Sequence, residues 1–249
     1  MLKLHLPSGR QEETVKRRIV FVIVEGPSDD EALSLLLEKM YERDSVYVYI
    51  AHCDVTTMRD KSENYVSGSS ILTRVGDIIR TYMNANHLRK EHFREIVHLI
   101  DMDGAYIPDE AVIYSEEHRA PFYTTSAILT DCVNNIRARN RQKRSCIDKL
   151  SAIRMLCGIP YQAYYMSSNL DHVLYDRLNL TDREKERFSI GFARRYRNSL
   201  SEFISFISDS AFSVADCDYV ESWHFIKDGL HSLERHTNFG ICIKRAFGY

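Results

Sequence analysis

The apolar residues of this chain gather in short runs that alternate with helical patterns. Residues 18–24 and 96–100 are mostly apolar and rich in β-branched side chains, which indicates buried strands of a parallel sheet. Residues 29–41 repeat leucine and methionine at helical spacing, residues 46–50 alternate as a strand does, and residues 71–84 carry another one-sided helical pattern. This order predicts an α/β fold with a doubly wound, mostly parallel sheet flanked by helices.

The second half of the chain has a mainly helical pattern. An apolar stripe at helical spacing runs over residues 126–156, and residues 161–166 form a further candidate strand. From Thr181 onward, a capping-box signature is followed by helical apolar patterns. We therefore predict an α/β domain over residues 15–176, with a helical insertion around residues 124–157. A mainly helical C-terminal region is predicted over residues 177–249.

Composition narrows the class of protein. The 249 residues carry a formal net charge of −2, so the overall field does not attract a polyanion. The six cysteines are scattered without a CxxC pair, which fits a reduced cytoplasmic setting better than a zinc ribbon or a disulfide framework. No apolar run reaches the length of a transmembrane helix, and the first residues are too polar for a signal peptide. We expect a cytoplasmic protein without membrane association.

Acidic residues follow two of the predicted strands. Glu25 and Asp29 stand in EGPSDD after the first strand, and Asp101 and Asp103 stand in DMDG after the third. The carboxyl ends of parallel strands meet at one edge of a sheet, where open α/β sheets place their ligands. Carboxylates gathered there repel one another, and a divalent cation relieves that repulsion. The pattern predicts a site for one or two Mg²⁺ or Mn²⁺ ions.

These two motifs, EGPSD and DMD, resemble those of the Toprim (topoisomerase-primase) domain, which topoisomerases, primases and OLD-type nucleases share. The resemblance covers about residues 17–176 and implies a Toprim-like sheet. OLD-type nucleases add further acidic ligands and, in some cases, a lysine. Carried over position by position, the resemblance implies catalytic roles for Glu25, Asp101, Asp103 and Lys227, and metal ligation by Glu25, Asp29, Asp101, Asp103 and Asp171.

The resemblance implies a metal-dependent endonuclease that hydrolyses phosphodiester bonds of DNA or RNA. The chain lacks the P-loop pattern GxxxxGK[ST], so it carries no recognisable ATPase of its own. By analogy with small Toprim effectors of bacterial anti-phage defence, the chain is expected to be a toxic effector that a separate ABC-type ATPase activates. Assembly into a homo-oligomer is also open. This part of the expectation rests on analogy alone.

Two other functions stay open at this stage. A strand followed by DxDG also begins haloacid-dehalogenase-like magnesium phosphatases, in which Asp101 would be the nucleophile and Asp103 the general acid. That interpretation leaves the EGPSD motif without a role. The second alternative is a catalytically silent Toprim scaffold that binds nucleic acid or protein through its basic helices.

A basic stretch, IRARNRQKRSCIDKL, lies within the predicted insertion. Its positive side chains spread around a helix and could neutralise phosphates beside the metal site, although a solvated or partner-binding helix face explains the pattern equally well. The nucleic-acid-binding residues predicted on this basis are Arg137, Arg139, Arg141, Lys143 and Arg144.

Overall fold

The computed structural model describes residues 18–41, 46–52, 56 and 70–247. Its main sheet has five strands in the order β2-β1-β3-β8-β7, and β2, β1, β3 and β8 run parallel. The short edge strand β7 pairs antiparallel with β8. The predicted α/β class with a mostly parallel sheet is confirmed. The strand bounds are β1 (Arg18–Val24), β2 (Val46–His52), β3 (Phe93–Asp101), β7 (Met155–Leu156) and β8 (Ile159–Met166).

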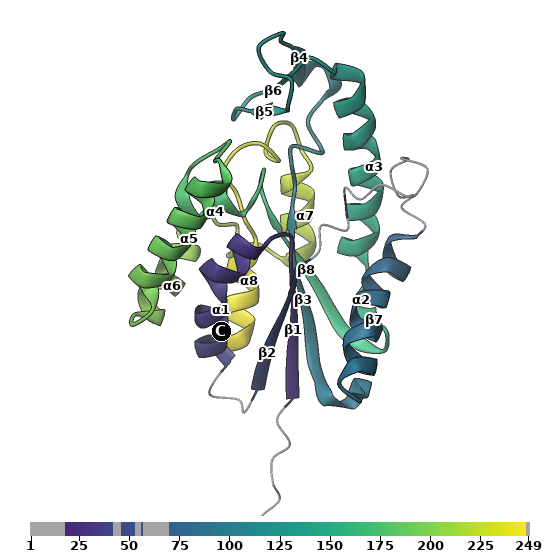
Figure 1. The fold of residues 1–249 in the computed structure, drawn as a ribbon, viewed down its shortest axis with the longest axis vertical. Coiled ribbons are helices and arrows are strands. Elements are labelled where there is room, and N and C mark those ends of the chain that lie inside the picture. The colour runs from purple at the N-terminus through teal and green to yellow at the C-terminus, as the bar shows by residue number, and fades with distance from the viewer. Residues whose placement is uncertain (1–17, 42–45, 53–55, 57–69, 248–249) are drawn as a thin grey trace, which may run out of the picture.

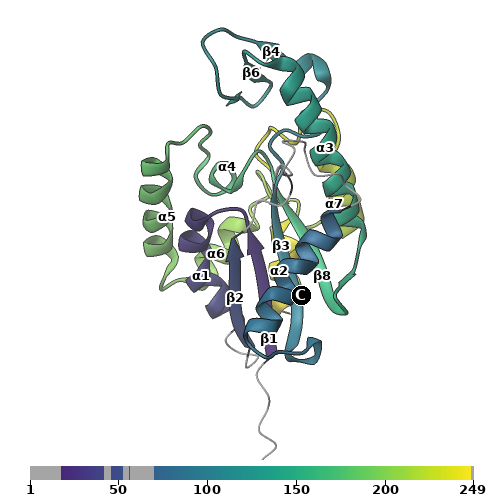
Figure 2. The same cartoon turned by 45° about the vertical axis from the view of Figure 1, so that its right-hand side comes forward.

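Helices cover both faces of this sheet, as Figures 1 and 2 show. The side chains of β1 alternate: Val20, Val22 and Val24 belong to one buried cluster, and Phe21 and Ile23 belong to another. The first cluster is completed by α1 (Pro27–Tyr41), α4 (Leu170–Tyr175), α5 (Asp182–Tyr196), α6 (Leu200–Ile207) and α8 (Phe239–Phe247). The second is completed by α2 (Ile71–Ala85), α3 (Val133–Ala152) and α7 (Tyr219–Ile226).

The early elements lie where the apolar pattern predicts them. Strand β1 has the predicted bounds, and α1 begins two residues before the predicted start. Helix α2 extends the predicted helix by one residue, and the short helix η2 (Lys90–His92) leads from it into β3. These segments are predictable because their buried apolar residues are contiguous or regularly spaced, so local pattern and packing agree.

The segment between β3 and α3 departs from the prediction. Residues 128–130, expected to be helical, form strand β6 of a small sheet with the order β4-β6-β5, and α3 begins only at Val133. Ile128 and Thr130 are buried and Leu129 is not, which is the alternation of a strand. Figure 1 shows this sheet beyond the carboxyl ends of the main strands. Its elements are η3 (Asp109–Ala111), β4 (Val112–Tyr114), β5 (Phe122–Tyr123) and β6 (Ile128–Thr130).

The C-terminal region contains α5, α6, α7 and α8, and it packs onto both faces of the main sheet. On one face, Phe239 of α8 contributes to the cluster that includes α1. On the other face, the Trp223 ring of α7 lies 5.3 Å from that of Tyr165 in β8. The domain boundary expected near residue 176 stays a prediction. No helix within the described residues has both the length and the apolar composition needed to cross a bilayer.

Candidate active site

The predicted acidic residues stand where the strand order changes direction. Strand β1 lies between β2 and β3, so the chain moves to one side of β1 first and to the other side afterwards. Such a switch point leaves a crevice at the carboxyl ends of the two central strands. Glu25 follows β1 directly and Asp101 is the last residue of β3. The Asp101 backbone N–H donates to Glu25 Oε1 at 3.2 Å, which joins the two strand ends.

Backbone geometry explains the DMDG sequence. Asp103 and Gly104 have φ angles of 48° and 64°, in the left-handed region that glycine, asparagine and aspartate tolerate best. A Cβ atom on Gly104 would lie 2.6 Å from the Leu233 side chain, so any other residue there would be strained and would displace Leu233. The turn is held by the Asp103 N–H, which donates to the Ser168 carbonyl at 2.7 Å. Asp101 Oδ1 accepts the N–H of Leu170, at the start of α4, at 3.0 Å.

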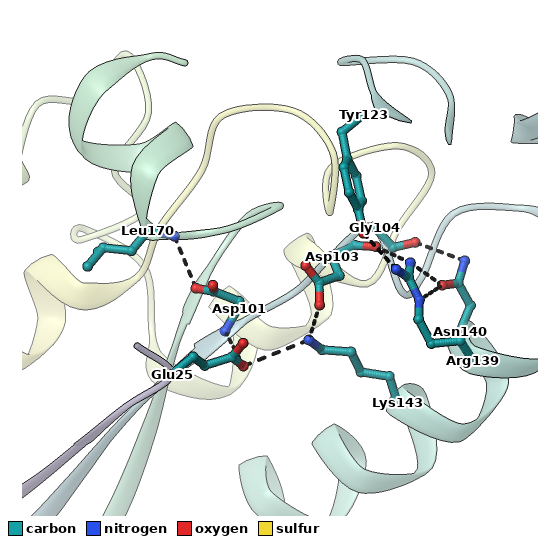
Figure 3. A network of polar contacts seen from close by, with 9 residues as sticks. All are labelled: Glu25, Asp101, Asp103, Gly104, Tyr123, Arg139, Asn140, Lys143 and Leu170. Atoms are coloured by element: carbon teal, nitrogen blue, oxygen red, sulfur yellow. Dashed lines mark hydrogen bonds and ion pairs between the residues drawn. The ribbon is translucent and has the colours of Figure 1, made fainter. Parts of the chain in front are cut away.

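A lysine from α3 reaches the acidic residues from below the turn (Figure 3). The Lys143 side chain is fully buried, and its ammonium forms a short ion pair with Asp103 Oδ2. The same Nζ atom lies 3.8 Å from Glu25 Oε1. One turn earlier on α3, Arg139 donates to the Asp103 carbonyl at 2.8 Å and to the Tyr123 hydroxyl at 2.6 Å. Helix α3 therefore supplies two buried cations to the Asp103 turn.

The charges at this site are only partly balanced. Burial alone would raise the pKa of Asp103, but Lys143 and Arg139 outweigh that effect and lower it. Burial raises the pKa of Asp101 well above its ordinary value, and the negative charges of Glu25, Asp29 and Asp103 raise it further. Lys143 offsets only part of this repulsion. Burial and the neighbouring carboxylates therefore disfavour the charged form of Asp101.

Asp29 and Asp171 form a second acidic pair beside the first group. Asp29 lies in the first turn of α1 and accepts the Gly26 N–H at 2.9 Å. Burial raises its pKa to about 6, and the charge of Asp171 adds to this rise. Asp171, in the first turn of α4, pairs with Lys185 of α5 at 3.3 Å. Because Asp29 also raises the pKa of Asp101, the two acidic groups are electrostatically coupled.

The structure places Lys227 elsewhere. Its ammonium lies 2.7 Å from Asp148 Oδ1 and over the rings of Tyr106 and Trp223. Among the predicted lysines, Lys143 is the one that contacts the acidic residues. The sequence contains a signal for this, since Lys143 shares one face of α3 with the buried apolar residues at positions 136, 147 and 150.

The basic stretch of α3 mostly faces the protein and not the solvent. Four of its five predicted nucleic-acid-binding residues donate hydrogen bonds to the segment 103–109, and they do so mainly through its backbone carbonyls. That segment has few strand partners, and its buried carbonyls require donors. The four residues are Arg137, Arg139, Lys143 and Arg144. Only Arg141 keeps a largely exposed side chain, 3.6 Å from an Asp109 carboxylate oxygen.

The donor chemistry of the acidic site suits a divalent cation. Carboxylate oxygens are the ligands that Mg²⁺ and Mn²⁺ prefer, and a further cation would stabilise the charged form of Asp101, which burial and its acidic neighbours disfavour. In the arrangement seen here, the Lys143 ammonium lies between Glu25 and Asp103 (Figure 3). Within residues 18–41, 46–52, 56 and 70–247, no group of three or more histidine, cysteine, aspartate or glutamate side chains is placed so that it could hold a metal ion. The donor type fits such an ion, but the side chains as they lie here do not form a site for one.

Comparison with known proteins adds no assignment. No protein-family model, curated protein or solved structure matches this chain.

Proposed function

We propose that this chain is a metal-dependent nuclease of the Toprim type that hydrolyses phosphodiester bonds in DNA or RNA. One observation carries the proposal: Glu25 and Asp101 meet at the switch point of a parallel sheet, with Asp103 in the adjoining turn. Open α/β sheets bind ligands at such a switch point, and burial together with the neighbouring carboxylates raises the pKa of Asp101 there. The EGPSD and DMD motifs lie at these strand ends.

One or two Mg²⁺ or Mn²⁺ ions held by Glu25, Asp101 and Asp103 would polarise the phosphate and lower the pKa of a bound water. Asp29 and Asp171 lie beside these residues and extend the set of available carboxylates. Asp101 is held in place by the Leu170 N–H, and Asp103 by its left-handed turn. These backbone contacts fix where the two carboxyl groups begin, and the Glu25 and Asp103 side chains would still have to turn from Lys143 toward an ion.

Lys143 has a role of its own in this proposal. Its ammonium neutralises Asp103 and stabilises the acidic site without a metal. For Lys143 to act on the substrate, other positive charge would have to take over that function, and the fully buried ammonium would have to turn from Asp103 to a non-bridging phosphate oxygen. A buried lysine donor aimed at developing negative charge stabilises the transition state of phosphoryl transfer. We assign this role to Lys143 in preference to Lys227, which pairs with Asp148.

A specific observation favours a second candidate, the catalytically silent scaffold. The Lys143 ammonium already provides a counter-charge to Glu25 and Asp103. If that ammonium stays in place, the site is complete as a structural ion-pair network and needs no metal. The effector role beside a separate ATPase remains a proposal that rests on the Toprim resemblance alone.

Cleavage assays test the proposed nuclease. Plasmid DNA, single-stranded DNA and transfer RNA are incubated with the wild type, Glu25→Gln, Asp101→Asn and the control Asp148→Asn, in Mg²⁺ or Mn²⁺ and in chelator. Asp148 is an exposed acidic residue that pairs with Lys227. The control therefore removes a carboxylate, as the other two variants do, but away from the acidic site. We expect the first two variants to lose at least about 100-fold in rate, the scale for a positioned acid–base group, and the control to keep its activity.

Other results identify the alternatives. Cleavage that survives in Glu25→Gln and Asp101→Asn contradicts the proposed site. Release of phosphate from a small phosphomonoester, dependent on Asp101 but not on Glu25, indicates the phosphatase. Nucleic-acid binding that survives chelation, without cleavage in either metal, indicates the scaffold.

A further inference from the structure

A cleft of about 480 Å³ opens beside the acidic site. One wall is formed by residues 117–123, which include strand β5 of the small sheet. The other wall is formed by residues at the beginning of α4 and of α5, among them Asn169, Asn179 and Lys185. The volume lies within the range of about 300–1,000 Å³ that is typical of small-ligand pockets. The cleft is therefore large enough for one unit of a polymer such as a nucleotide.

Hydrogen bonds hold the two walls together. The Tyr123 N–H donates to Asn179 Oδ1 at 2.8 Å, and Asn179 Nδ2 donates to the Tyr123 carbonyl at 2.7 Å. The Tyr123 hydroxyl accepts from Arg139, which also donates to the Asp103 carbonyl (Figure 3). This chain of contacts fixes the cleft relative to the Asp103 turn.

Three lining residues connect the cleft to the acidic site. Lys185 pairs with Asp171. Burial alone would lower the pKa of Lys185, but the negative charges of Asp171, Asp101 and Asp29 outweigh that effect and raise it. Asn169 caps α4, and the next residue, Leu170, donates its N–H to Asp101. Tyr123 reaches the Asp103 carbonyl through Arg139. A ligand in this cleft therefore lies next to the carboxylates.

An aromatic pair forms part of the cleft wall. The rings of His118 and Phe122 stack with centroids 4.4 Å apart and an angle of 14° between their planes. Phe122 keeps 37% of its surface exposed. The His118 N–H donates to the Ser115 carbonyl, and its own carbonyl accepts the Asp131 N–H at 2.9 Å, so the backbone of this wall is anchored. A large exposed aromatic in an anchored segment is a ready stacking surface.

Positive charge accompanies this stacking surface. Arg119 is exposed and, within the described part of the chain, makes no ion pair. Lys185 is about one-third exposed on the opposite wall, while Glu117 adds one negative charge to the lining. An aromatic platform flanked by cations is the pattern that proteins use to bind single-stranded nucleic acid, with the base on the ring and the phosphates near the charges.

We propose that this cleft binds one unpaired nucleotide of the substrate beside the scissile phosphate. Its base stacks on the outer face of the Phe122 ring, whose other face is covered by His118, and its phosphate contacts Arg119 and Lys185. A base inside a duplex has both faces covered by its neighbours, so the cleft selects single strands, loops or ends over continuous duplex. This inference rests on the proposed nuclease function and specifies the form of its substrate.

Binding without metal tests the cleft separately from cleavage. Fluorescence anisotropy is measured in chelator with labelled oligo(dT), oligo(U) and a blunt duplex, for the wild type, Phe122→Ala, Phe122→Trp, Arg119→Ala and the control Tyr114→Ala. Tyr114 is 60% exposed in the same small sheet but does not line the cleft. We expect Phe122→Ala to weaken single-strand binding about tenfold, which corresponds to the loss of one stacked base. Phe122→Trp should restore it, Arg119→Ala should weaken it and lessen its dependence on salt, and Tyr114→Ala should leave it unchanged.

The two oligonucleotides distinguish DNA from RNA as the bound strand. The inference is overturned if the wild type binds neither, if Phe122→Ala binds as the wild type does, or if the duplex binds as tightly with the same dependence on Phe122. Binding that depends on Phe122, without cleavage in metal, would support the cleft and contradict the nuclease. Cleavage that depends on Glu25 but not on Phe122 would support the nuclease and contradict the cleft.

Discussion

Two lysines stand at the carboxyl edge of the sheet in opposite circumstances. Lys143 is fully buried and contacts both Asp103 and Glu25, whereas Lys185 is about one-third exposed, pairs with Asp171 and lines an open cleft. The first is part of the folded framework, because its removal would leave buried charge without a partner. The second is partly exposed and can turn to a ligand, but its partner Asp171 is buried and would then lose its cation.

The same contrast separates the two groups of basic residues near the site. Most arginines of α3 donate to backbone carbonyls of the segment 103–109 and so stabilise the turn that carries Asp103. Arg119 and Lys185, which no charge pattern distinguishes in the sequence, line the cleft. Density of positive charge along a helix therefore indicates where donors are needed, but it does not show whether the acceptor is a ligand or the protein's own backbone.

Replacement of Lys143 by methionine should have the largest effect on stability. Methionine fills much of the same space but leaves Asp103 and Glu25 without the ammonium. We expect the free energy of unfolding to fall by about 3–5 kcal/mol, the scale for breaking a buried pair from one side. Lys185→Met should cost less, about 1–3 kcal/mol, because Lys185 is partly solvated although its partner Asp171 is buried. Urea denaturation of both variants measures the difference, and equal losses would abolish the distinction between the two lysines.

Asp29 should make the free energy of unfolding depend on pH. Burial raises the pKa of Asp29 from 3.8 to about 6, so its contribution to stability is full below 3.8 and is lost as the pH rises through 6. Asp29→Asn removes this loss. We expect the variant to gain up to about 3 kcal/mol over the wild type between roughly pH 4 and pH 7.5. Denaturation at several pH values measures this gain, and a constant difference would show that Asp29 ionises freely in the folded protein.

Arg139 and Arg141 sharpen the comparison within α3 itself. Arg139 is buried and donates to Asp103 and Tyr123, whereas the Arg141 side chain is 61% exposed. Arg139→Met should lower the free energy of unfolding by about 2 kcal/mol, because buried acceptors lose a charged donor. Arg141→Met should change it by less than about 0.5 kcal/mol. Thermal unfolding compares them, and a larger loss for Arg141 would mean that the exposed arginine carries the structural role.

The strands and the acidic residues at their ends are predictable because both depend on local pattern. The apolar runs before Glu25 and Asp101 delimit β1 and β3, and parallel pairing then brings the two strand ends together. The early helices follow from regular apolar spacing in the same way.

What the sequence does not predict depends on contacts between distant segments. Strand β6 forms because residues 112–114 and 122–123 pair with it, and no local signal identifies those short strands. The role of Lys143 depends on which face of α3 meets the Asp103 turn. The cleft requires Tyr123 to meet Asn179, 56 positions along the chain. Pairings of this kind are set by tertiary packing and not by propensity.

Binding of Mn²⁺, measured by titration calorimetry near neutral pH, tests the central claim most directly. The wild type is compared with Glu25→Gln and with the control Asp148→Asn. In the wild type, the exposed Asp148 carboxylate forms an ion pair with Lys227. We predict one or two bound ions in the wild type, affinity at least about tenfold weaker in Glu25→Gln, and no change in Asp148→Asn. If the wild type binds no Mn²⁺, or if Glu25→Gln binds it equally well, the carboxylates at the strand ends do not form a metal site and Lys143 is their counter-charge.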